Sequence, residues 1–288
     1  MDRAALQRQL LHRGGAPGHW GSLGLWPGAP GHHTPDETDY AGACRALALA
    51  VGHAAGLQPG SRVLSLACGA GDELLLWAGH FGAAQVLGVE IDPASADLAA
   101  RQAAGTAAIQ VLCRSALALP AELALAGPFD AIVCVDAAYH LAPRSAFLAD
   151  ALQRLRPGGR LAFCDLTLRA GSSPLLRAAA RLCGVPAADL LPLPQQVQRL
   201  QALGFARVQA RELDDPVLGG FARFVRRQAA SQRLRPWQAG WRAAATTAAL
   251  VGPCRAAGLG YALLSASRPA TTSAERTALS SSGTPACA

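Results

Sequence analysis

The sequence predicts an α/β fold in which a doubly wound, mostly parallel sheet is flanked by helices. Short apolar runs alternate with longer amphipathic runs from about residue 60 to residue 167, a pattern typical of βαβ units. The first apolar run ends in a loop of small residues, A-C-G-A-G-D at 67–72, that opens a helix. The next run ends in an acid, Glu90, about twenty residues after the loop, where nucleotide-binding units place a carboxylate.

The individual elements follow from periodicity and from turn residues. A helix over 41–57 precedes the sheet, because Cys44, Leu47, Val51 and Ala54 fall on one face. The core is then expected as strand 62–67, helix 72–80, strand 86–91, helix 94–104, strand 109–113, strand 130–135, helix 143–155 and strand 160–166. A proline-rich, partly helical insert at 168–200 leads to helix 194–203, strand 206–213, helix 215–229 and a final antiparallel strand at 258–267.

These elements predict a single main domain over residues 41–267. Within it, residues 60–167 form the ligand-binding half, and we expect the insert at 168–200 to form another wall of the ligand pocket. Residues 1–40 hold a segment rich in Gly, Pro, His and Trp that cannot form a regular element. Residues 268–288 are rich in Ser, Thr and Ala, and we expect them to be disordered.

The composition and the N-terminal residues indicate the cellular compartment. The chain has 288 residues, 51% of them hydrophobic, but no apolar run long enough to span a membrane. The N-terminal residues lack the apolar centre of a secretory signal. Their arginine spacing faintly suggests a mitochondrial presequence, against which Asp2 argues. We therefore predict a cytoplasmic protein, with the mitochondrial matrix as the weaker alternative.

The net charge of +7 does not indicate a nucleic-acid partner. Every basic residue that contributes to it is an arginine, and these arginines are dispersed without the stripe expected along a phosphate backbone. One concentration is interpreted as a solvated helix face, with an anionic partner as the alternative; it comprises Arg223, Arg226, Arg227, Arg233, Arg235 and Arg242. No C-x-x-C pair occurs among the eight cysteines, so we expect neither a metal site nor a disulfide.

Four motifs in order carry a resemblance to a known family. The run V-L-S-L-A-C-G-A-G at 63–71 resembles motif I of the class I S-adenosylmethionine-dependent methyltransferases, V-L-D-x-G-C-G-x-G. The runs at 88–92, 129–136 and 155–161 are similar to the family's second strand, fourth strand and L-K-P-G-G-x-L turn. The resemblance is to the small-molecule (type 11/25-like) group. It implies a Rossmann-like sheet of seven strands with an antiparallel last strand, and S-adenosyl-L-methionine as cofactor.

The resemblance also implies positions for the cofactor. Backbone groups of the loop would meet its methionine part, Glu90 would accept hydrogen bonds from the ribose hydroxyls, and Ile91 would pack on the adenine. The complete cofactor-binding set is Ala67, Cys68, Gly69, Gly71, Glu90, Ile91, Ser115, Ala116 and Val135. A reading of Glu90 as a helix cap is less favoured, because Asp92 fits that role better.

Three residues depart from the family pattern. Ser65 replaces the usual aspartate of motif I, Ala67 replaces its first glycine, and Ser115 replaces the aspartate beside the adenine. A lost charge-assisted hydrogen bond costs about 1.5–3 kcal/mol, so affinity would fall at each site. These departures keep open a non-catalytic, methyltransferase-like binding or scaffold protein.

Candidate catalytic residues follow the fourth strand. His140 would take a proton from an acceptor O–H or N–H, and Tyr139 would line the acceptor pocket. The alternatives are a polar helix-entry residue for His140 and simple packing for Tyr139. Methyl transfer needs little acid–base help when the acceptor is already nucleophilic, and alignment then supplies the acceleration.

The N-terminal tryptophans provide the remaining clue. Trp20 and Trp26 lie in a segment that resembles the lid of small-molecule methyltransferases, which would exclude water. The alternative is a surface loop that buries its tryptophans on helix 41–57. We predict methyl transfer to a small, apolar acceptor through an O, N or C atom. A nicotinamide-dependent oxidoreductase is disfavoured by the glycine spacing.

Overall fold

The computed structural model describes residues 19–26, 40–119, 128–169, 174–182, 185–230 and 239–270. Its strands are β1 (Arg62–Leu66), β2 (Gln85–Glu90), β3 (Ile109–Cys113), β4 (Phe129–Cys134), β5 (Leu155–Leu168), β6 (Ala206–Glu212) and β7 (Leu259–Ser267). The helices of the ligand-binding half are α2 (Tyr40–Ala54), α3 (Asp72–Gly79), α4 (Pro93–Ala103), η1 (Ala138–His140) and α6 (Arg144–Arg154). The C-terminal helices are α7 (Pro174–Leu182), α8 (Leu193–Ala202), η2 (Asp214–Gly219), α9 (Gly220–Ala230) and α10 (Ala239–Ala256).

The strands form one seven-stranded sheet with the order β3-β2-β1-β4-β5-β7-β6. The pairs β3–β2, β2–β1, β1–β4 and β4–β5 are parallel, whereas β7 runs antiparallel to both of its neighbours. The predicted fold class, including the antiparallel last strand, is therefore confirmed. Strand order reverses between β1 and β4, the point at which doubly wound sheets bind ligands.

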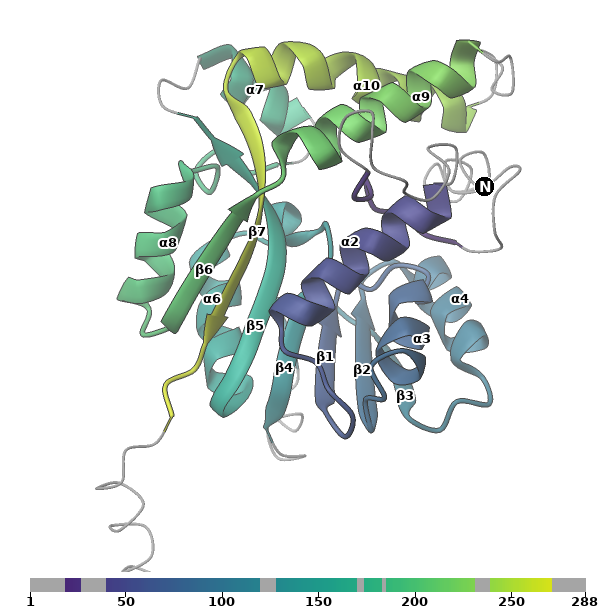
Figure 1. Ribbon diagram of the computed structural model, residues 1–288, viewed down its shortest axis with the longest axis vertical. Coiled ribbons are helices and arrows are strands. Elements are labelled where there is room, and N and C mark those ends of the chain that lie inside the picture. The colour runs from purple at the N-terminus through teal and green to yellow at the C-terminus, as the bar shows by residue number, and fades with distance from the viewer. Residues whose placement is uncertain are drawn as a thin grey trace, which may run out of the picture.

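Apolar residues cover both faces of the sheet, as expected for parallel strands buried between helices. On β1 and β4, alternate residues such as Val63 and Val133 face the α2 and α3 side, while Leu64 and Ile132 face the α6 and α8 side. Figure 1 shows α2 and α3 crossing in front of the sheet. The helices between strands lie where the sequence predicts them, and Asp92 caps α4 by accepting from the Ser95 amide at 2.8 Å.

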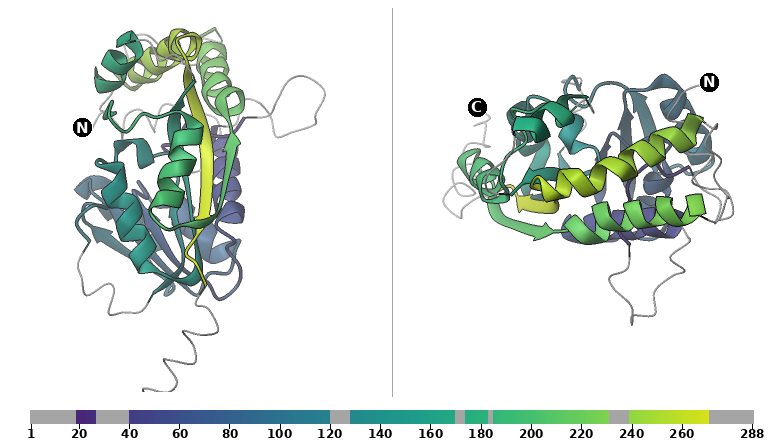
Figure 2. Two further views of the ribbon diagram at one scale, coloured as in Figure 1. Left: turned by 90° about the vertical axis from the view of Figure 1, so that its left-hand side faces the viewer. Right: turned by 90° about the horizontal axis from the view of Figure 1, so that it is seen from above.

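The helices α7, α9 and α10 gather at the end of the sheet beyond the carboxyl end of β5 (Figure 1). Figure 2 shows α9 and α10 lying side by side when seen from above. We call these three helices with η2 the cap. The helix predicted over 215–229 is present as η2 and α9, but α10 was not anticipated, because its small, alanine-rich residues show almost no helical periodicity.

Two further differences concern boundaries. Strand β5 begins at Leu155, directly after α6, whereas the sequence analysis starts it at residue 160. The reason is that Leu155 pairs with Phe129 of β4 across a register shift, so the proline–glycine turn lies within the strand. Most of the segment 1–40 and the tail after residue 270 lie outside the described residues, so the expectations for them stay predictions.

The N-terminal segment that is described, residues 19–26, is here called the strap. The Leu25 amide donates to the Ala43 carbonyl of α2, and the Trp26 amide donates to the Pro216 carbonyl of η2, both at 2.8 Å. The Tyr40 hydroxyl donates to the Ser22 carbonyl at 2.6 Å. These bonds fix the strap between the cap and the sheet.

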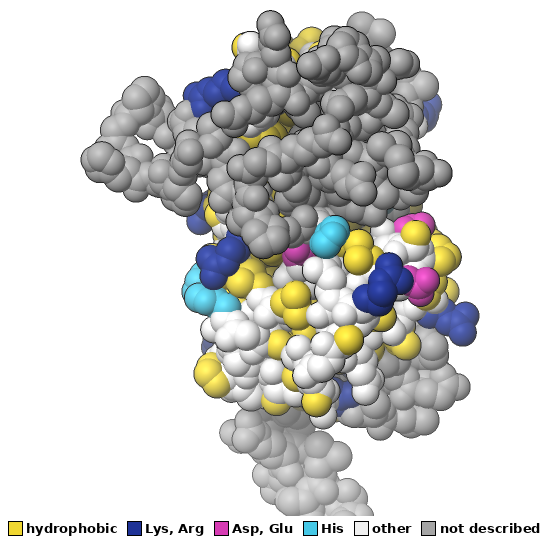
Figure 3. Space-filling model, turned by 90° about the vertical axis from the view of Figure 1, so that its right-hand side faces the viewer, with side chains coloured by type: hydrophobic (Ala, Val, Ile, Leu, Met, Phe, Trp, Pro, Cys, Tyr) yellow, Lys and Arg dark blue, Asp and Glu magenta, His cyan; other side chains and the backbone are white. Residues whose placement is uncertain are grey.

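On the face shown in Figure 3, arginines are separated from one another by neutral atoms. Of the predicted basic cluster, Arg223 pairs with Asp215 at 3.3 Å, and Arg255 of α10 pairs with the same carboxylate at 3.1 Å. Within the described ranges no helix combines the length and hydropathy needed to cross a bilayer.

Candidate active site

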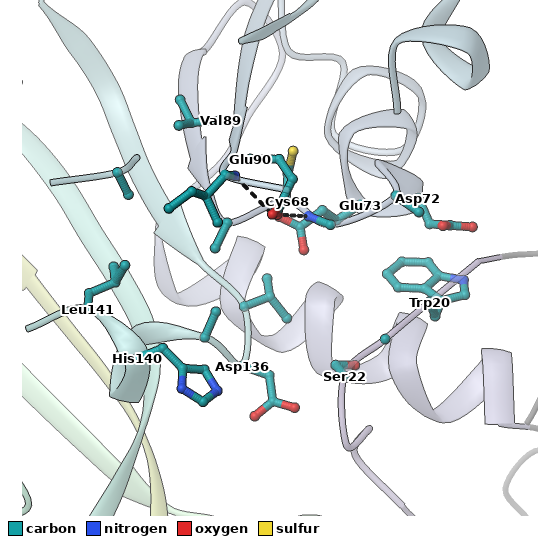
Figure 4. A pocket seen from close by; sticks show the side chains of 18 of the residues that line it. Trp20, Ser22, Cys68, Asp72, Glu73, Val89, Glu90, Asp136, His140 and Leu141 are labelled. Atoms are coloured by element: carbon teal, nitrogen blue, oxygen red, sulfur yellow. Dashed lines mark hydrogen bonds between the residues drawn. The ribbon is translucent and has the colours of Figure 1, made fainter. Parts of the chain in front are cut away.

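A cavity of about 620 Å³ opens at the carboxyl ends of β1, β2, β3 and β4. This volume lies within the usual range of small-molecule pockets, ~300–1,000 Å³. Figure 4 shows that its lining side chains come from the strap, the loop after β1, the end of β2 and the turn after β4. Ten of the predicted site residues line it: Trp20, Ala67, Cys68, Gly69, Glu90, Ile91, Ser115, Ala116, Val135 and His140.

The loop after β1 turns sharply beneath the cavity. Ala67 and Gly69 both have positive φ, 54° and 56°. The loop therefore adopts a left-handed backbone conformation that residues with side chains rarely take. A Cβ built on Gly69 would meet nothing within 4 Å, so the space beside this residue is open to a ligand. The loop opens α3 at Asp72, so the free amides of that helix start lie nearby.

Gly71 has a different role from the predicted one, because it does not line the cavity. Its φ is 92°, and a Cβ placed there would lie 2.8 Å from the Ala99 Cβ of α4. Gly71 is therefore a packing residue that lets α3 and α4 approach each other, one position behind the ligand-facing part of the loop.

Glu90 ends β2 and is only 8% exposed. One carboxylate oxygen accepts from the Ile91 and Asp92 amides, both at 2.9 Å, and the other accepts from the Gly69 amide at 2.8 Å. The side chain thus ties the loop to β2. A carboxylate offers about four acceptor positions, so roughly one remains for a ligand hydroxyl.

The end of the cavity beyond Glu90 suits a flat, apolar group. Ile91 is 67% exposed and lines the cavity, an exposure that costs free energy unless a ligand covers it. Ser115 and Ala116 line the same cavity, and the Ser115 hydroxyl accepts from the Leu117 amide at 3.2 Å. The positions predicted for adenine contact therefore all line this cavity.

Two acids at the start of α3 were missed by the sequence analysis. Asp72 accepts from the His19 amide at 2.9 Å, while its other oxygen is buried and has no partner among the described residues. Glu73 is 6% exposed and accepts a hydrogen bond from the Ser65 hydroxyl. Burial raises the pKa of Glu73 to about 8. An acid preceding the apolar run 74–78 is the sequence signal that would have pointed to it.

Asp136, which follows β4, was also missed as a site residue. Its carboxylate accepts from the Tyr261 hydroxyl at 2.6 Å, from the Tyr139 hydroxyl at 3.1 Å and from the Leu23 amide of the strap. Its φ of 54° is strained for a residue with a side chain. Burial raises its pKa to about 6, against the opposing effect of these donors.

His140 and Tyr139, the predicted catalytic pair, point in different directions. His140 is exposed in the short helix η1 and lines the cavity (Figure 4). The Tyr139 ring lies beside it in a tilted arrangement, with ring centroids 4.5 Å apart, but its hydroxyl donates to Asp136 and the residue does not line the cavity. The structure thus gives His140 access to a ligand and makes Tyr139 part of its support.

The two predicted lid tryptophans also differ. Trp20 lines the cavity, in keeping with a closing residue. Trp26 does not line it: it is 5% exposed, stacks on Phe224 of α9 with centroids 4.7 Å apart, and donates through Nε1 to the Leu23 carbonyl at 2.8 Å. Trp26 therefore anchors the strap. It is buried against α9 and also against α2, the helix on which the sequence predicted its burial.

The insert predicted as a second wall lies farther away. Its described residues, 168–169, 174–182 and 185–200, are absent from the lining of this cavity. Leu176, Val185 and Leu190 form instead a small apolar cluster with Leu168, against which Tyr139 packs. In the described part of the chain no group of three His, Cys, Asp or Glu side chains is arranged to hold a metal.

Comparison with known proteins gives consistent results. Residues 63–159 match the family described as "Methyltransferase domain". Erythromycin 3''-O-methyltransferase from Saccharopolyspora erythraea is 28% identical over 233 residues, covering 75% of this chain and 72% of that protein.

Two solved structures illustrate the fold. The [4+2]-cyclase SpnF is 22% identical, with a TM-score of 0.68 and 92% of each chain covered. Geranyl diphosphate C-methyltransferase from Streptomyces coelicolor, solved with S-adenosyl-L-homocysteine, is 15% identical, with a TM-score of 0.64, 86% of this chain and 87% of that chain covered.

Features of the cavity itself are compatible with S-adenosylmethionine. The open space beside Gly69, the remaining acceptor position on Glu90 and the exposed face of Ile91 suit the methionine, ribose and adenine parts that the sequence assigns to them. The carboxyl groups of Asp72 and Glu73 also line the cavity, beside the start of α3. Residues 63–159 thus match a methyltransferase domain, and the cavity at the carboxyl ends of β1, β2, β3 and β4 resembles a site for S-adenosylmethionine.

Proposed function

We propose that the enzyme methylates a small, apolar acceptor that lies between the cofactor and His140. The observation that carries this proposal is the position of His140, exposed on the cavity wall opposite the loop after β1 and Glu90 (Figure 4). S-adenosylmethionine supplies the methyl group as an activated, electrophilic centre. The protein then has to align the acceptor and remove a proton from it.

His140 is the residue we assign to proton removal. Its imidazole reaches the cavity, whereas the carboxylate of Asp136 already accepts three hydrogen bonds from Tyr139, Tyr261 and the strap. Asp136 is thus a positioning residue that fixes the turn carrying His140 and holds the strap across the cavity. Trp20 on the strap would shield the reacting atoms from water.

An apolar acceptor is supported by the surroundings of the turn. Val135, Ala137 and Leu141, which flank His140 in the sequence, are apolar and line the cavity. The name of the Saccharopolyspora relative specifies an oxygen acceptor. A hydroxyl group on an apolar natural product is therefore the first acceptor class to test, with N and C acceptors following.

The test is an assay of metabolite extracts with methyl-labelled S-adenosylmethionine, followed by identification of the labelled product. We expect a labelled, organic-extractable compound that is lost in His140→Ala. The second candidate, a binding protein without methyl transfer, is favoured by Ala67 at positive φ where the family has glycine, and by Ser65. Tight cofactor binding with no labelled product from any extract would support that candidate instead.

A further inference from the structure

We infer that Glu73 is the residue that meets the positive charge on the methionine part of the cofactor, and that it loses its proton when the cofactor binds. The inference rests on the cofactor site used in the proposed function, but not on methyl transfer. It assigns to α3 the charge that motif I lacks in this chain.

The first step is the position of Glu73. It lies on the cavity wall next to Cys68 of the loop that we expect to hold the methionine part, and Figure 4 shows Glu73, Cys68 and Glu90 close together. One of its oxygens accepts from Ser65, and the other accepts no hydrogen bond from the described residues. Beside it, the buried second oxygen of Asp72 also lacks a partner there.

The second step is the charge around Glu73. Four titratable groups interact electrostatically with Glu73: the carboxylates of Glu90 and Asp72 and the thiols of Cys68 and Cys134. None of these is a cation. Its hydrogen-bond donor Ser65 is neutral, and the neutral Trp77 indole donates in turn to the Ser65 hydroxyl at 3.2 Å. A 94% buried carboxyl in such a setting is neutral unless a ligand brings positive charge.

The third step links Glu73 to Ser65. The family pattern has an aspartate at position 65, on β1, and no such acid is present here. A carboxylate at 65 would contact the Glu73 carboxylate directly, so the two acids would repel each other. Serine at 65 instead donates its hydroxyl proton to Glu73. Serine at position 65 and glutamate at position 73 are therefore linked. The carboxyl group that the family pattern has on β1 is supplied in this chain by α3.

The consequence is a proton balance. S-adenosylmethionine carries an ammonium and a sulfonium group on its methionine part, and either would favour the ionised form of Glu73. Because burial holds the pKa of the free site at about 8, the proton is present at neutral pH and leaves to solvent on binding. Affinity should therefore rise with pH up to about 8.

The experiment is titration calorimetry at pH 6.5 in buffers of different ionisation enthalpy, which counts the protons released on binding. Three ligands are compared: S-adenosylmethionine, S-adenosylhomocysteine and 5′-methylthioadenosine, which lacks both cationic groups. The proteins are wild type, Glu73→Gln and, as a control outside the cavity lining, Glu212→Gln on β6, which should behave as wild type. The difference between wild type and Glu73→Gln is the quantity of interest, because it cancels the titration of the ligand's own amino group.

We expect wild type to release close to one proton more than Glu73→Gln with S-adenosylmethionine, and no more with 5′-methylthioadenosine. Affinity of Glu73→Gln for S-adenosylmethionine should be about 10- to 100-fold lower at pH 8, and Ser65→Asp in that background should restore part of it. Release with S-adenosylhomocysteine identifies the ammonium as the partner, and its absence identifies the sulfonium.

Equal proton release by wild type and Glu73→Gln would overturn the inference, as would a pH-independent wild-type affinity. The wild-type pH series needs no variant and so does not depend on how Glu73→Gln folds. If all three ligands fail to bind wild type, the cofactor site itself is wrong, a result distinct from failure of the Glu73 assignment alone.

Discussion

The two ends of the cavity differ in how their residues are held. On the cofactor side, most of the hydrogen bonds come from main-chain groups. The Glu90 carboxylate accepts hydrogen bonds from three backbone amides and so fixes the loop after β1. On the acceptor side, contacts between distant segments dominate, because Asp136 joins β7, η1 and the strap through Tyr261, Tyr139 and Leu23. A local motif specifies the first side, whereas the second depends on the complete fold.

The largest effect should come from the acceptor side. We expect His140→Ala to lower kcat by roughly 10²–10⁴ while cofactor affinity stays nearly constant, because the imidazole acts on the acceptor alone. The wild-type rate should rise with pH as the imidazole loses its proton. Steady-state kinetics with the identified acceptor measure both. A variant within a few-fold of wild type would mean that alignment carries the reaction and His140 is only a wall.

Trp26 tests whether the strap depends on the cap. Replacement of Trp26 by Ala removes the stack on Phe224 and should lower the free energy of unfolding by about 3–5 kcal/mol. Trp20→Ala is the matched control: Trp20 is half-buried at the cavity, so we expect a smaller loss of stability and a weaker cofactor affinity. Urea unfolding followed by circular dichroism separates the two. Equal losses would contradict the assignment of Trp26 as the anchor.

Glu90 tests the cofactor side. Glu90→Ala should weaken S-adenosylhomocysteine binding by about 1.5–3 kcal/mol, or roughly 10- to 100-fold, because a charged acceptor is lost and the loop is released. The exposed Glu212 of β6, far along the sheet order from β2, provides a control variant, Glu212→Ala, with unchanged affinity. Calorimetric titration gives both values, and an unaltered Glu90→Ala affinity would show that the ribose lies elsewhere.

The two loop glycines should respond differently to alanine. Gly71→Ala combines positive φ with a contact of 2.8 Å to Ala99, so we expect a loss of about 2–4 kcal/mol in stability. Gly69→Ala meets open space, so only the backbone cost of about 1 kcal/mol applies, together with weaker ligand binding. Thermal unfolding with and without S-adenosylhomocysteine distinguishes them. Loss of stability larger at Gly69 than at Gly71 would reverse our assignment.

The smallest effect is on the pH dependence of stability. The native pKa of Glu73 is raised to about 8 and that of Asp136 to about 6, so the folded state binds these protons more tightly than the unfolded chain. The resulting stabilisation is complete below the unfolded pKa values and is lost as pH rises through about 6 and then 8. Without ligand, Tm should be a few degrees higher at pH 5 than at pH 8.5, and Glu73→Gln should flatten the upper part of this curve. A Tm that rises over the same range would contradict the assignment.

Sequence reasoning could select residues that line one cavity on the cofactor side because the motifs that mark them are local. The glycine loop, the acid ending β2 and the turn before β5 each lie within a few consecutive residues, and their order implies the sheet. Of the nine residues predicted for the cofactor, Gly71 alone lies behind the cavity, because nothing in the loop sequence reveals the approach of Ala99.

The acceptor side could not be derived in the same way. The partners of Asp136 lie 3, 113 and 125 residues away in the chain, and Trp26 is buried by Phe224 of α9. Helix α10 has too little amphipathic pattern to be recognised. Glu73 was missed for a different reason. The role assigned to it depends on its contact with Ser65, and only the packing of α3 on β1 brings these two side chains together.

The most direct test of the central claim is calorimetric titration of the wild-type protein with S-adenosylmethionine, with NADH as the comparison ligand. The account predicts saturable binding at one site per chain for S-adenosylmethionine, a 10- to 100-fold weaker affinity in Glu90→Ala, and no binding of NADH. Absence of S-adenosylmethionine binding at millimolar concentration, or a preference for NADH, would contradict it.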